Sequence, residues 1–204
     1  MSPLQAENII SFLKENIEPL EDNVSGKGYR ASAYLTDGTF LPCVTFYNNQ
    51  RTIDLAIRRF KEEQSGKSVF SKSSGMGYRD IVKTFVTSGN CINHYDIAKV
   101  EKSKFAFPNH VIKQIHGETK MGWTGFVARM KDGEQFAFGT DWHIAFFNMP
   151  DGYVADDIQE IINHTYIDKA GQLKSYHSPE VYQEFSKSFV FESKPFFECY
   201  LDNL

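Results

Sequence analysis

Two Asp-Gly pairs, each between stretches of alternating apolar residues, constrain the fold of this chain more than any other feature. The pairs are Asp37-Gly38, between residues 29–36 and 39–47, and Asp132-Gly133, between residues 123–130 and 134–140. Both residues of such a pair accept the positive φ angles of a two-residue type I′ turn. The sequence therefore predicts two antiparallel β-hairpins, each with one apolar face turned toward a core.

A two-residue turn also fixes the register of the first hairpin. It places apolar residues of both strands on one face, namely Tyr29, Ala31, Ala33 and Leu35 with Phe40, Pro42, Val44 and Phe46. Proline has no backbone N–H and cannot donate a hydrogen bond within a sheet. Pro42 therefore indicates that its strand is an edge strand or carries a β-bulge.

Helices are predicted where apolar residues recur at helical spacing or where a residue suited to a helix start precedes the segment. These segments are residues 2–17, 52–64, 93–101, 154–164 and 178–185. In the second of them, Ile53, Ala56, Ile57 and Phe60 are predicted to face inward. Further strands are predicted at residues 78–87, 111–119 and 142–148, and an extended tail at residues 188–201.

The predicted fold class is α+β, with an antiparallel sheet built from β-hairpins and a meander, and four or five packed helices. A chain of 204 residues can form one large domain or two small ones. Residues 65–77 are rich in Ser and Gly, as is typical of a loop or linker. We expect a single globular domain over residues 1–204, with two lobes, about 1–64 and 78–204, as the alternative.

Charge and cysteine content narrow the compartment and the partners. The net charge is −4 and the pI about 5.9, so the chain lacks the basic footprint expected for binding nucleic acid or an anionic membrane. The three cysteines are widely spaced, which favours free thiols in a reducing compartment. The sequence shows no signal-peptide pattern and no apolar run of roughly 18–20 residues. We expect a cytoplasmic protein without a membrane partner.

Familiar catalytic motifs do not account for the chain. Gly66-Lys67-Ser68 resembles the end of a phosphate-binding loop, but Lys61 stands where that motif needs its first glycine. A nucleophile elbow and a dinucleotide-binding fingerprint are both missing from the sequence. Cys91 precedes a predicted helix, where a thiol can be activated, yet an inert thiol is the simpler interpretation. We therefore expect no cofactor.

Four polar residues at strand spacing form the candidate catalytic cluster. His116 and Glu118 are two apart on one predicted strand, and Asp141 and His143 are two apart beyond another. Alternation along a strand places each pair on one face. Two imidazoles and two carboxylates can bind a divalent metal or act as acid and base.

A second polar pair is predicted on the helix at residues 154–164. Glu160 and His164 are four residues apart, a spacing that can hold a metal. A solvated helix face and a histidine near a helix C-terminus explain this pair equally. We therefore assign no metal site from the sequence.

Trp123 and Trp142 are the two tryptophans and the candidate binding residues. The two-residue turn at Asp132-Gly133 would place them opposite one another, on one face with Val127, Phe136 and Phe138. Core packing is the first interpretation of this group. A surface that binds a ligand or a partner is the alternative, because indole combines a large apolar area with an N–H donor.

The sequence favours a non-enzymatic cytosolic protein that binds another protein, as an accessory protein of the inhibitor, regulator or immunity type. Its acidic charge and its aromatic content of 15% agree with this hypothesis. The alternative is a metal-dependent or acid–base enzyme that uses the His/Asp/Glu cluster of the second-half sheet. A nucleic-acid-binding function is disfavoured by the charge, and the oligomeric state is left open.

Overall fold

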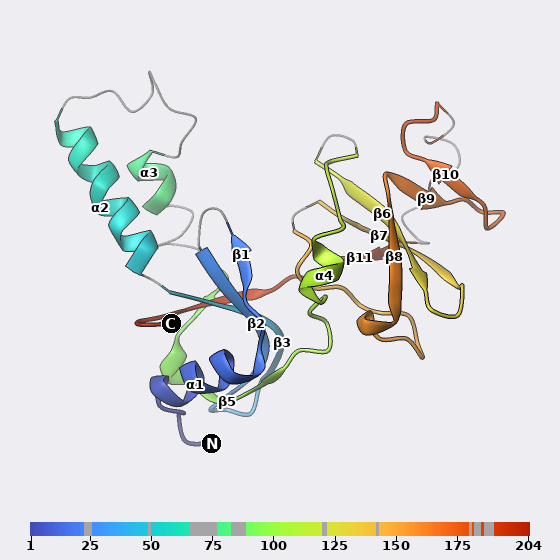
Figure 1. The fold of residues 1–204 in the computed structure, drawn as a ribbon. Coiled ribbons are helices and arrows are strands. Elements are labelled where there is room, and N and C mark those ends of the chain that lie inside the picture. Colours follow the sequence, from blue (N-terminus) through green and yellow to red (C-terminus); the bar gives the residue numbers. More distant parts are fainter. Residues whose placement is uncertain are drawn as a thin grey trace. The chain divides into compact units, whose positions relative to one another are not determined.

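The computed structural model describes residues 1–22, 26–48, 50–65, 77–82, 89–119, 122–141, 143–179, 181, 185 and 190–204. The chain divides into two compact units (Figure 1). Unit 1 contains Met1–Lys102 and Phe196–Leu204, and unit 2 contains Ser103–Pro195. The chain therefore passes from one unit to the other after Lys102 and again after Pro195, whereas the sequence suggested a division at residues 65–77. The Ser/Gly-rich stretch at 65–77, most of which lies outside the described residues, falls within the residue range of unit 1.

Unit 1 contains a six-stranded sheet. Its strands are β1 (Leu20–Asp22), β2 (Gly26–Leu35), β3 (Phe40–Asn48), β4 (Cys91–Ile92), β5 (Ile97–Lys102) and β12 (Phe197–Leu201). Neighbouring strands follow the order β1-β2-β3-β12-β4, and β5 pairs with β2. β12 runs parallel to both of its neighbours, and the other pairs are antiparallel. The prediction of an antiparallel sheet was therefore wrong for unit 1, because a distant strand inserts between β3 and β4.

The hairpin of β2 and β3 is confirmed, and its irregularity occurs at Pro42. The register shifts between Ala31 and Ala33, so that Ser32 lies opposite two residues, Pro42 and Cys43. The Ser32 hydroxyl donates a hydrogen bond to the Pro42 carbonyl at 3.0 Å. Proline has no N–H to contribute to the sheet, so a bulge at this point interrupts the pairing at low cost.

Both Asp-Gly turns contain three loop residues instead of the predicted two. In the first turn, the Gly38 N–H donates to the Leu35 carbonyl at 3.0 Å, and the Leu35 N–H donates to the Thr39 carbonyl at 2.8 Å. Gly38 has a φ of 95°, whereas Asp37 does not have the positive φ that a type I′ turn requires. The Asp37 carboxylate instead accepts the Thr39 N–H at 2.8 Å, which favours a type I turn followed by glycine. The second turn repeats this pattern.

The core of unit 1 forms between its sheet and helix α1 (Ala6–Asn16). The apolar stripe predicted for this helix is confirmed, since Ile9 and Leu13 are fully buried. Tyr29 and Ala31 of β2 and Phe46 of β3 lie in the same core, as their shared face predicts. Burying two large aliphatic side chains of this kind contributes roughly 1.5–3 kcal/mol each.

Unit 2 contains a four-stranded sheet and a separate hairpin. The sheet strands are β6 (Thr124–Met130), β7 (Gln135–Thr140), β8 (Ile158–Asn163) and β11 (Val190–Glu192), and the hairpin strands are β9 (Thr165–Ile167) and β10 (Leu173–Ser175). The sheet order is β11-β7-β6-β8, and β11 runs parallel to β7. Phenylalanine rings fill the core on one side of this sheet, where Phe126 and Phe138 stack at 5.6 Å and both contact Phe147.

Fewer helices form than the sequence predicts. Within the described residues, only α1 and α2 (Gln50–Gln64) are longer than four residues, and both were predicted. Residues 93–101 and 154–164 instead form a short 3₁₀ turn followed by a strand, β5 and β8 respectively. The prediction of four or five packed helices was therefore wrong, although the structure is compatible with the α+β class.

Other predicted elements also differ. The segments predicted as strands at residues 78–87 and 111–119 overlap the one-turn helices α3 (Tyr78–Ile81) and α4 (Asn109–Ile112). Residues 83–88 and half of the predicted helix at 178–185 lie outside the described residues.

A β-bulge explains why the sequence of β8 resembles a helix. Ile158 and Ile161 are both buried although they are three residues apart, which would place them on opposite faces of a regular strand. The register with β6 shifts between Arg129 and Met130, and the extra residue in β8 returns both isoleucines to one face. β5 has the same irregularity where it pairs with β2. In each strand the bulge produces the spacing that a helix would have.

Candidate functional site

Helix α2 of unit 1 carries three large apolar side chains in contact with solvent. Ile53, Ile57 and Phe60 are 43%, 46% and 44% exposed. Their spacing of four and then three residues places them along one side of the helix. We call these three residues the α2 stripe. The sequence predicted that they face inward, and the structure instead leaves almost half of each one uncovered.

The remainder of α2 is also poorly covered. Leu55, Ala56 and Arg59 are half-buried, and none of the α2 side chains that the structure describes is buried. The Phe60 ring packs against Tyr78 of α3, with ring centroids 5.3 Å apart. A helix of 15 residues is only marginally stable in water by itself, since most helical stability comes from packing an apolar face. α2 therefore has apolar surface whose burial would stabilise it.

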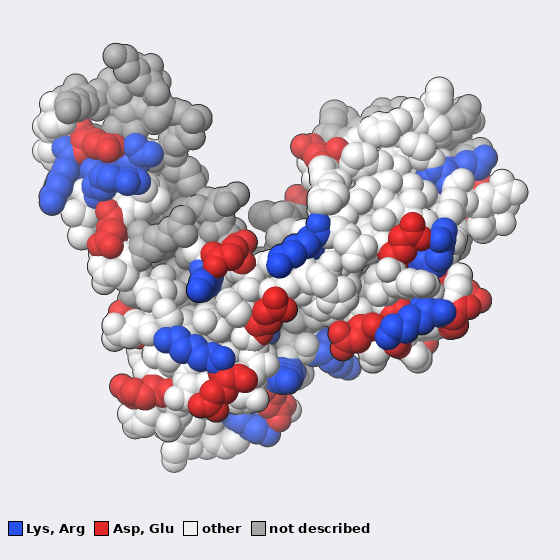
Figure 2. Space-filling view, in the orientation of Figure 1, with Lys and Arg blue, Asp and Glu red and all other residues white. Residues whose placement is uncertain are grey.

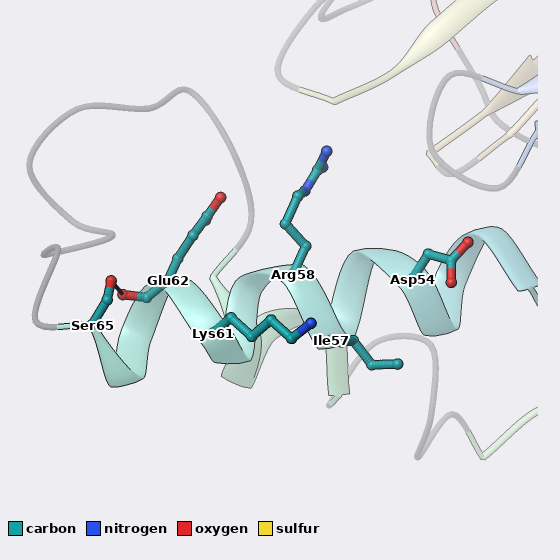
Figure 3. Close-up of a pocket in the computed structure, with 6 residues that line it drawn as sticks. All are labelled: Asp54, Ile57, Arg58, Lys61, Glu62 and Ser65. Carbon is teal, nitrogen blue, oxygen red and sulfur yellow. Dashed lines mark hydrogen bonds between the residues drawn. The ribbon is translucent and has the colours of Figure 1, made fainter.

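Charged side chains lie beside the α2 stripe. Figure 2 shows Lys and Arg side chains gathered over α2, with acidic side chains among them. A solvent-open hollow of about 390 Å³ lies along this side of the helix. It is lined by Asp54, Ile57, Arg58, Lys61, Glu62 and Ser65 (Figure 3).

The carboxylates of this hollow have partners on α2 itself. Asp54 accepts a hydrogen bond from the Gln50 amide at 2.8 Å, and Glu62 forms an ion pair with Arg59 at 2.8 Å. The ion pairs formed within the described part of the chain do not include Arg58 or Lys61. Arg58 and Lys61 thus line one hollow together with Ile57 of the stripe, and these two cations can receive carboxylates from outside the chain.

The candidate cluster predicted from sequence divides into two separate loops of unit 2. His116 and Glu118 are exposed and follow α4 in a loop, not in the predicted strand. The His116 N–H donates to the side-chain carbonyl of Asn163 at 2.9 Å. The Glu118 carboxylate accepts the backbone N–H of Gly122, so it closes its own loop.

Asp141 and His143 follow β7. Asp141 is exposed, whereas His143 is half-buried. Desolvation by burial lowers the pKa of His143 to about 4, so its ring is neutral near pH 7. Its Nδ1 accepts the Ala145 N–H at 3.1 Å, and its backbone N–H donates to the Thr140 hydroxyl at 3.1 Å. These bonds order the turn after β7, which is a structural role for His143.

Trp123 is buried, and Trp142 lies outside the described residues. The third loop residue at Asp132-Gly133 shifts the register by one, so Thr124 pairs with Thr140 instead of with Asp141. The Trp123 N–H donates to the Tyr176 hydroxyl at 3.2 Å. Burial raises the pKa of Tyr176 to about 12, so the hydroxyl stays protonated.

The packing around Trp123 involves two paired glycines. Trp123 lies against Gly139, and Tyr176 lies against Gly125, the cross-strand partner of Gly139. A small aromatic cluster with Tyr166 and Phe185 completes this packing. Trp123 is thus part of a core, as the first interpretation of the sequence has it.

The histidine predicted at the end of a helix lies instead in a strand connection. His164 links β8 to β9, and Glu160 of β8 forms an ion pair with Arg129 at 2.5 Å. The Nδ1 atom of His164 lies 3.4 Å from the Nε2 atom of His177, for which the sequence predicts no role. The two histidines are 13 residues apart, and only the β9–β10 hairpin brings them together.

Comparison with known proteins gives no relatives. No family model, curated protein or solved structure matches the chain. Among the described residues, no group of three or more His, Cys, Asp or Glu side chains has the arrangement of a metal site. No described helix is both long enough and apolar enough to cross a membrane.

Proposed function

We propose that this protein is a non-enzymatic, cytoplasmic accessory protein that binds another protein through the α2 stripe. The observation that supports the proposal is the exposure of Ile53, Ile57 and Phe60 along one side of a helix with no buried side chain among those described. Exposed apolar groups of this kind, bordered by polar residues, are typical of protein–protein contacts. None of the three cysteines, which all lie within the described residues, forms a disulfide bond, and this supports a reducing compartment.

The partner that fits this surface presents apolar side chains flanked by carboxylates. Covering the exposed part of the α2 stripe contributes on the order of 1 kcal/mol for each side chain. Arg58 and Lys61 line a hollow together with Ile57 and attract acidic groups, whereas Asp54 and Glu62 already have partners on α2. An acidic amphipathic helix laid along α2 satisfies both requirements.

A capture experiment with matched variants tests the proposal. Untagged wild-type protein is immobilised and exposed to host lysate, and bound proteins are compared with those retained by Ile57→Asp. The matched control is Val154→Asp, because Val154 is 58% exposed and lies in unit 2. We expect a partner that wild type and Val154→Asp retain and Ile57→Asp loses, with binding that weakens as salt is raised.

Two results would contradict the proposal. The first is a partner whose retention does not change in Ile57→Asp, because such a partner binds elsewhere. The second is a lack of any saturable partner combined with a monomer–dimer equilibrium that Ile57→Asp abolishes. That outcome would mean that a second copy of the chain covers the stripe.

A further inference from the structure

Two imidazole rings meet at the open end of the β9–β10 hairpin of unit 2. His164 immediately precedes β9, and His177 follows β10. The Nδ1 atom of His164 and the Nε2 atom of His177 are 3.4 Å apart. The ring centroids are 5.3 Å apart and the ring planes are perpendicular, at 90°. His164 is half-buried and His177 is exposed, so solvent and ions reach the pair.

The tautomer of His164 follows from its second ring nitrogen. Nε2 lies 2.9 Å from the backbone carbonyl of His116. A carbonyl oxygen can only accept, so Nε2 carries the proton. In the neutral ring, Nδ1 then has a free electron pair, and this pair is directed toward His177.

The distance between the two nitrogens is long for a hydrogen bond and suits a shared metal ion. When His177 Nε2 carries the proton it can donate to His164 Nδ1, but at 3.4 Å this hydrogen bond is longer than the usual range of about 2.7–3.2 Å. Two imidazole nitrogens bound to a tetrahedral Zn²⁺ at about 2.0–2.1 Å lie roughly 3.3–3.4 Å from one another. We propose that His164 Nδ1 and His177 Nε2 bind one divalent transition-metal ion.

The surroundings of His164 resemble the outer shell of a metal ligand. A histidine that binds a metal almost always donates its other ring N–H to a carboxylate, a carbonyl or water, which fixes the ring orientation. The accepting loop is itself held in place, because the Asn163 amide accepts from the His116 N–H at 2.9 Å and donates to the Gln114 carbonyl at 2.7 Å. One hydrogen bond therefore fixes the His164 ring, and two more fix the loop that accepts it.

The backbone at the site is adapted to this arrangement. His164 has a φ of 56°, one of the two positive φ angles found at described non-glycine residues. Gly117 also has a positive φ of 73°, and a Cβ at this position would lie 3.1 Å from His164 Nε2. A non-glycine residue in this conformation costs on the order of 1 kcal/mol or more and persists where the surrounding structure requires it. The backbone thus permits the close approach of the ring to the loop.

The ligand set defines the class of metal. Imidazole nitrogens suit Zn²⁺, Cu²⁺ and Ni²⁺, and divalent affinity rises toward Cu²⁺. The part of the chain that the structure describes supplies two ligands and no third. Water or an external ligand completes the coordination shell, so the ion is exchangeable and keeps open positions. This site lies in unit 2 and is independent of the α2 stripe.

Metal titration of the full-length, untagged chain tests the proposal. Chelator-treated protein is titrated with Zn²⁺ in a calorimeter, and we expect saturation at one ion per chain. His177→Gln should lower the affinity by about tenfold or more, as should His164→Asn. Asparagine is chosen at 164 because it tolerates a positive φ. His110→Gln is the matched control, since His110 is also exposed in unit 2.

A spectroscopic measurement distinguishes an ion bound by this histidine pair from an ion bound weakly by any surface histidine. Electron paramagnetic resonance of the Cu²⁺-loaded chain should show coupling to two nitrogens in wild type and to one in His177→Gln. The proposal is overturned if the wild-type chain binds neither ion saturably, or if His110→Gln weakens binding as much as His177→Gln. Should His164→Asn fail to fold, the exposed His177→Gln variant decides the outcome.

Discussion

Replacing Gly139 with alanine tests how the aromatic cluster of unit 2 is supported. Gly139 of β7 and Gly125 of β6 are cross-strand partners. The indole of Trp123 lies over Gly139, where an added Cβ would be 2.6 Å from Cε2 of the ring and closer still to Cζ2. Trp123 is 8% exposed and its indole N–H donates a hydrogen bond to the Tyr176 hydroxyl, so the added methyl group must displace a ring that is packed and hydrogen-bonded.

The expected cost follows from three effects. Forcing an extra methyl into a packed core costs about 1–3 kcal/mol. Displacing the indole also strains or breaks its hydrogen bond to Tyr176, worth about 0.5–1.5 kcal/mol. Alanine is better than glycine in a strand by roughly 0.5–1 kcal/mol, which offsets part of the loss. We therefore expect Gly139→Ala to lower the free energy of unfolding by about 2 kcal/mol.

The same reasoning predicts a change of sign when the ring is removed. In a Trp123→Leu background the space above Gly139 opens, and only the strand preference of alanine remains. Gly139→Ala should then be neutral or stabilise by up to about 1 kcal/mol. The control is Gly89→Ala, where an added Cβ meets no described atom within 4 Å.

Urea unfolding measures these free energies. Tryptophan emission follows unit 2, since Trp123 and Trp142 both fall in its residue range, and circular dichroism serves for the variant without Trp123 and for Gly89→Ala, which lies in unit 1. The reasoning is refuted if Gly139→Ala unfolds within about 0.5 kcal/mol of wild type. It is equally refuted if the cost of the alanine is the same with and without the indole.

Three further predictions concern other sites. Burial lowers the pKa of His143 to about 4, whereas a histidine in the unfolded chain has a pKa of about 6.5. Between these two pH values His143 is therefore protonated in the unfolded chain and neutral in the folded chain. Stability should therefore fall from pH 6.5 toward pH 4, by at most about 1.4 kcal/mol per pH unit, and urea midpoints across this range should show a smaller fall in His143→Asn. Thermal unfolding should show a loss of about 2–5 kcal/mol for Leu13→Ala, which is fully buried, and less than about 0.5 kcal/mol for exposed Ile57→Ala. Iodoacetamide should label exposed Cys91 in the folded protein and spare buried Cys199, whose pKa burial raises to about 12, as peptide mass spectrometry would show.

Local signals in the sequence predicted the hairpins and the two long helices. The Asp-Gly pairs predicted the hairpins correctly because a glycine that accepts positive φ allows the chain to reverse in a two-residue or a three-residue loop. The exact loop length was not predictable from the dipeptide alone. It depends on the aspartate side chain, which accepts a backbone N–H two residues later.

The features that the sequence did not predict, the bulge in β8 and the parallel position of β12, arise from pairing between distant strands. Ile158 and Ile161 of β8 have helical spacing because of a bulge that exists only where β8 pairs with β6. The parallel position of β12 depends on strands more than a hundred residues earlier in the chain. Neither periodicity nor turn chemistry contains this information.

The candidate sites were predictable only in part. Amphipathic spacing placed Ile57 and Phe60 on one side of a helix but could not say whether unit 1 covers that side. His164 was a candidate because it lies four residues after Glu160. In the structure, Glu160 pairs with Arg129, and the His164 ring contacts the His116 carbonyl. His177 carried no local signal, because its relation to His164 arises from the β9–β10 hairpin.

The position of β12 has a consequence for how the protein is made. Residues 197–201 complete the sheet of unit 1 between β3 and β4, so this sheet cannot close until they leave the ribosome. At about 5–20 residues per second, roughly 5–20 seconds separate the synthesis of β5 from that of β12. Unit 2 is synthesised entirely within that interval. During translation, unit 2 therefore has time to fold first. Until β12 is synthesised, the edges of β3 and β4 that it pairs with stay unpaired and accessible to chaperones.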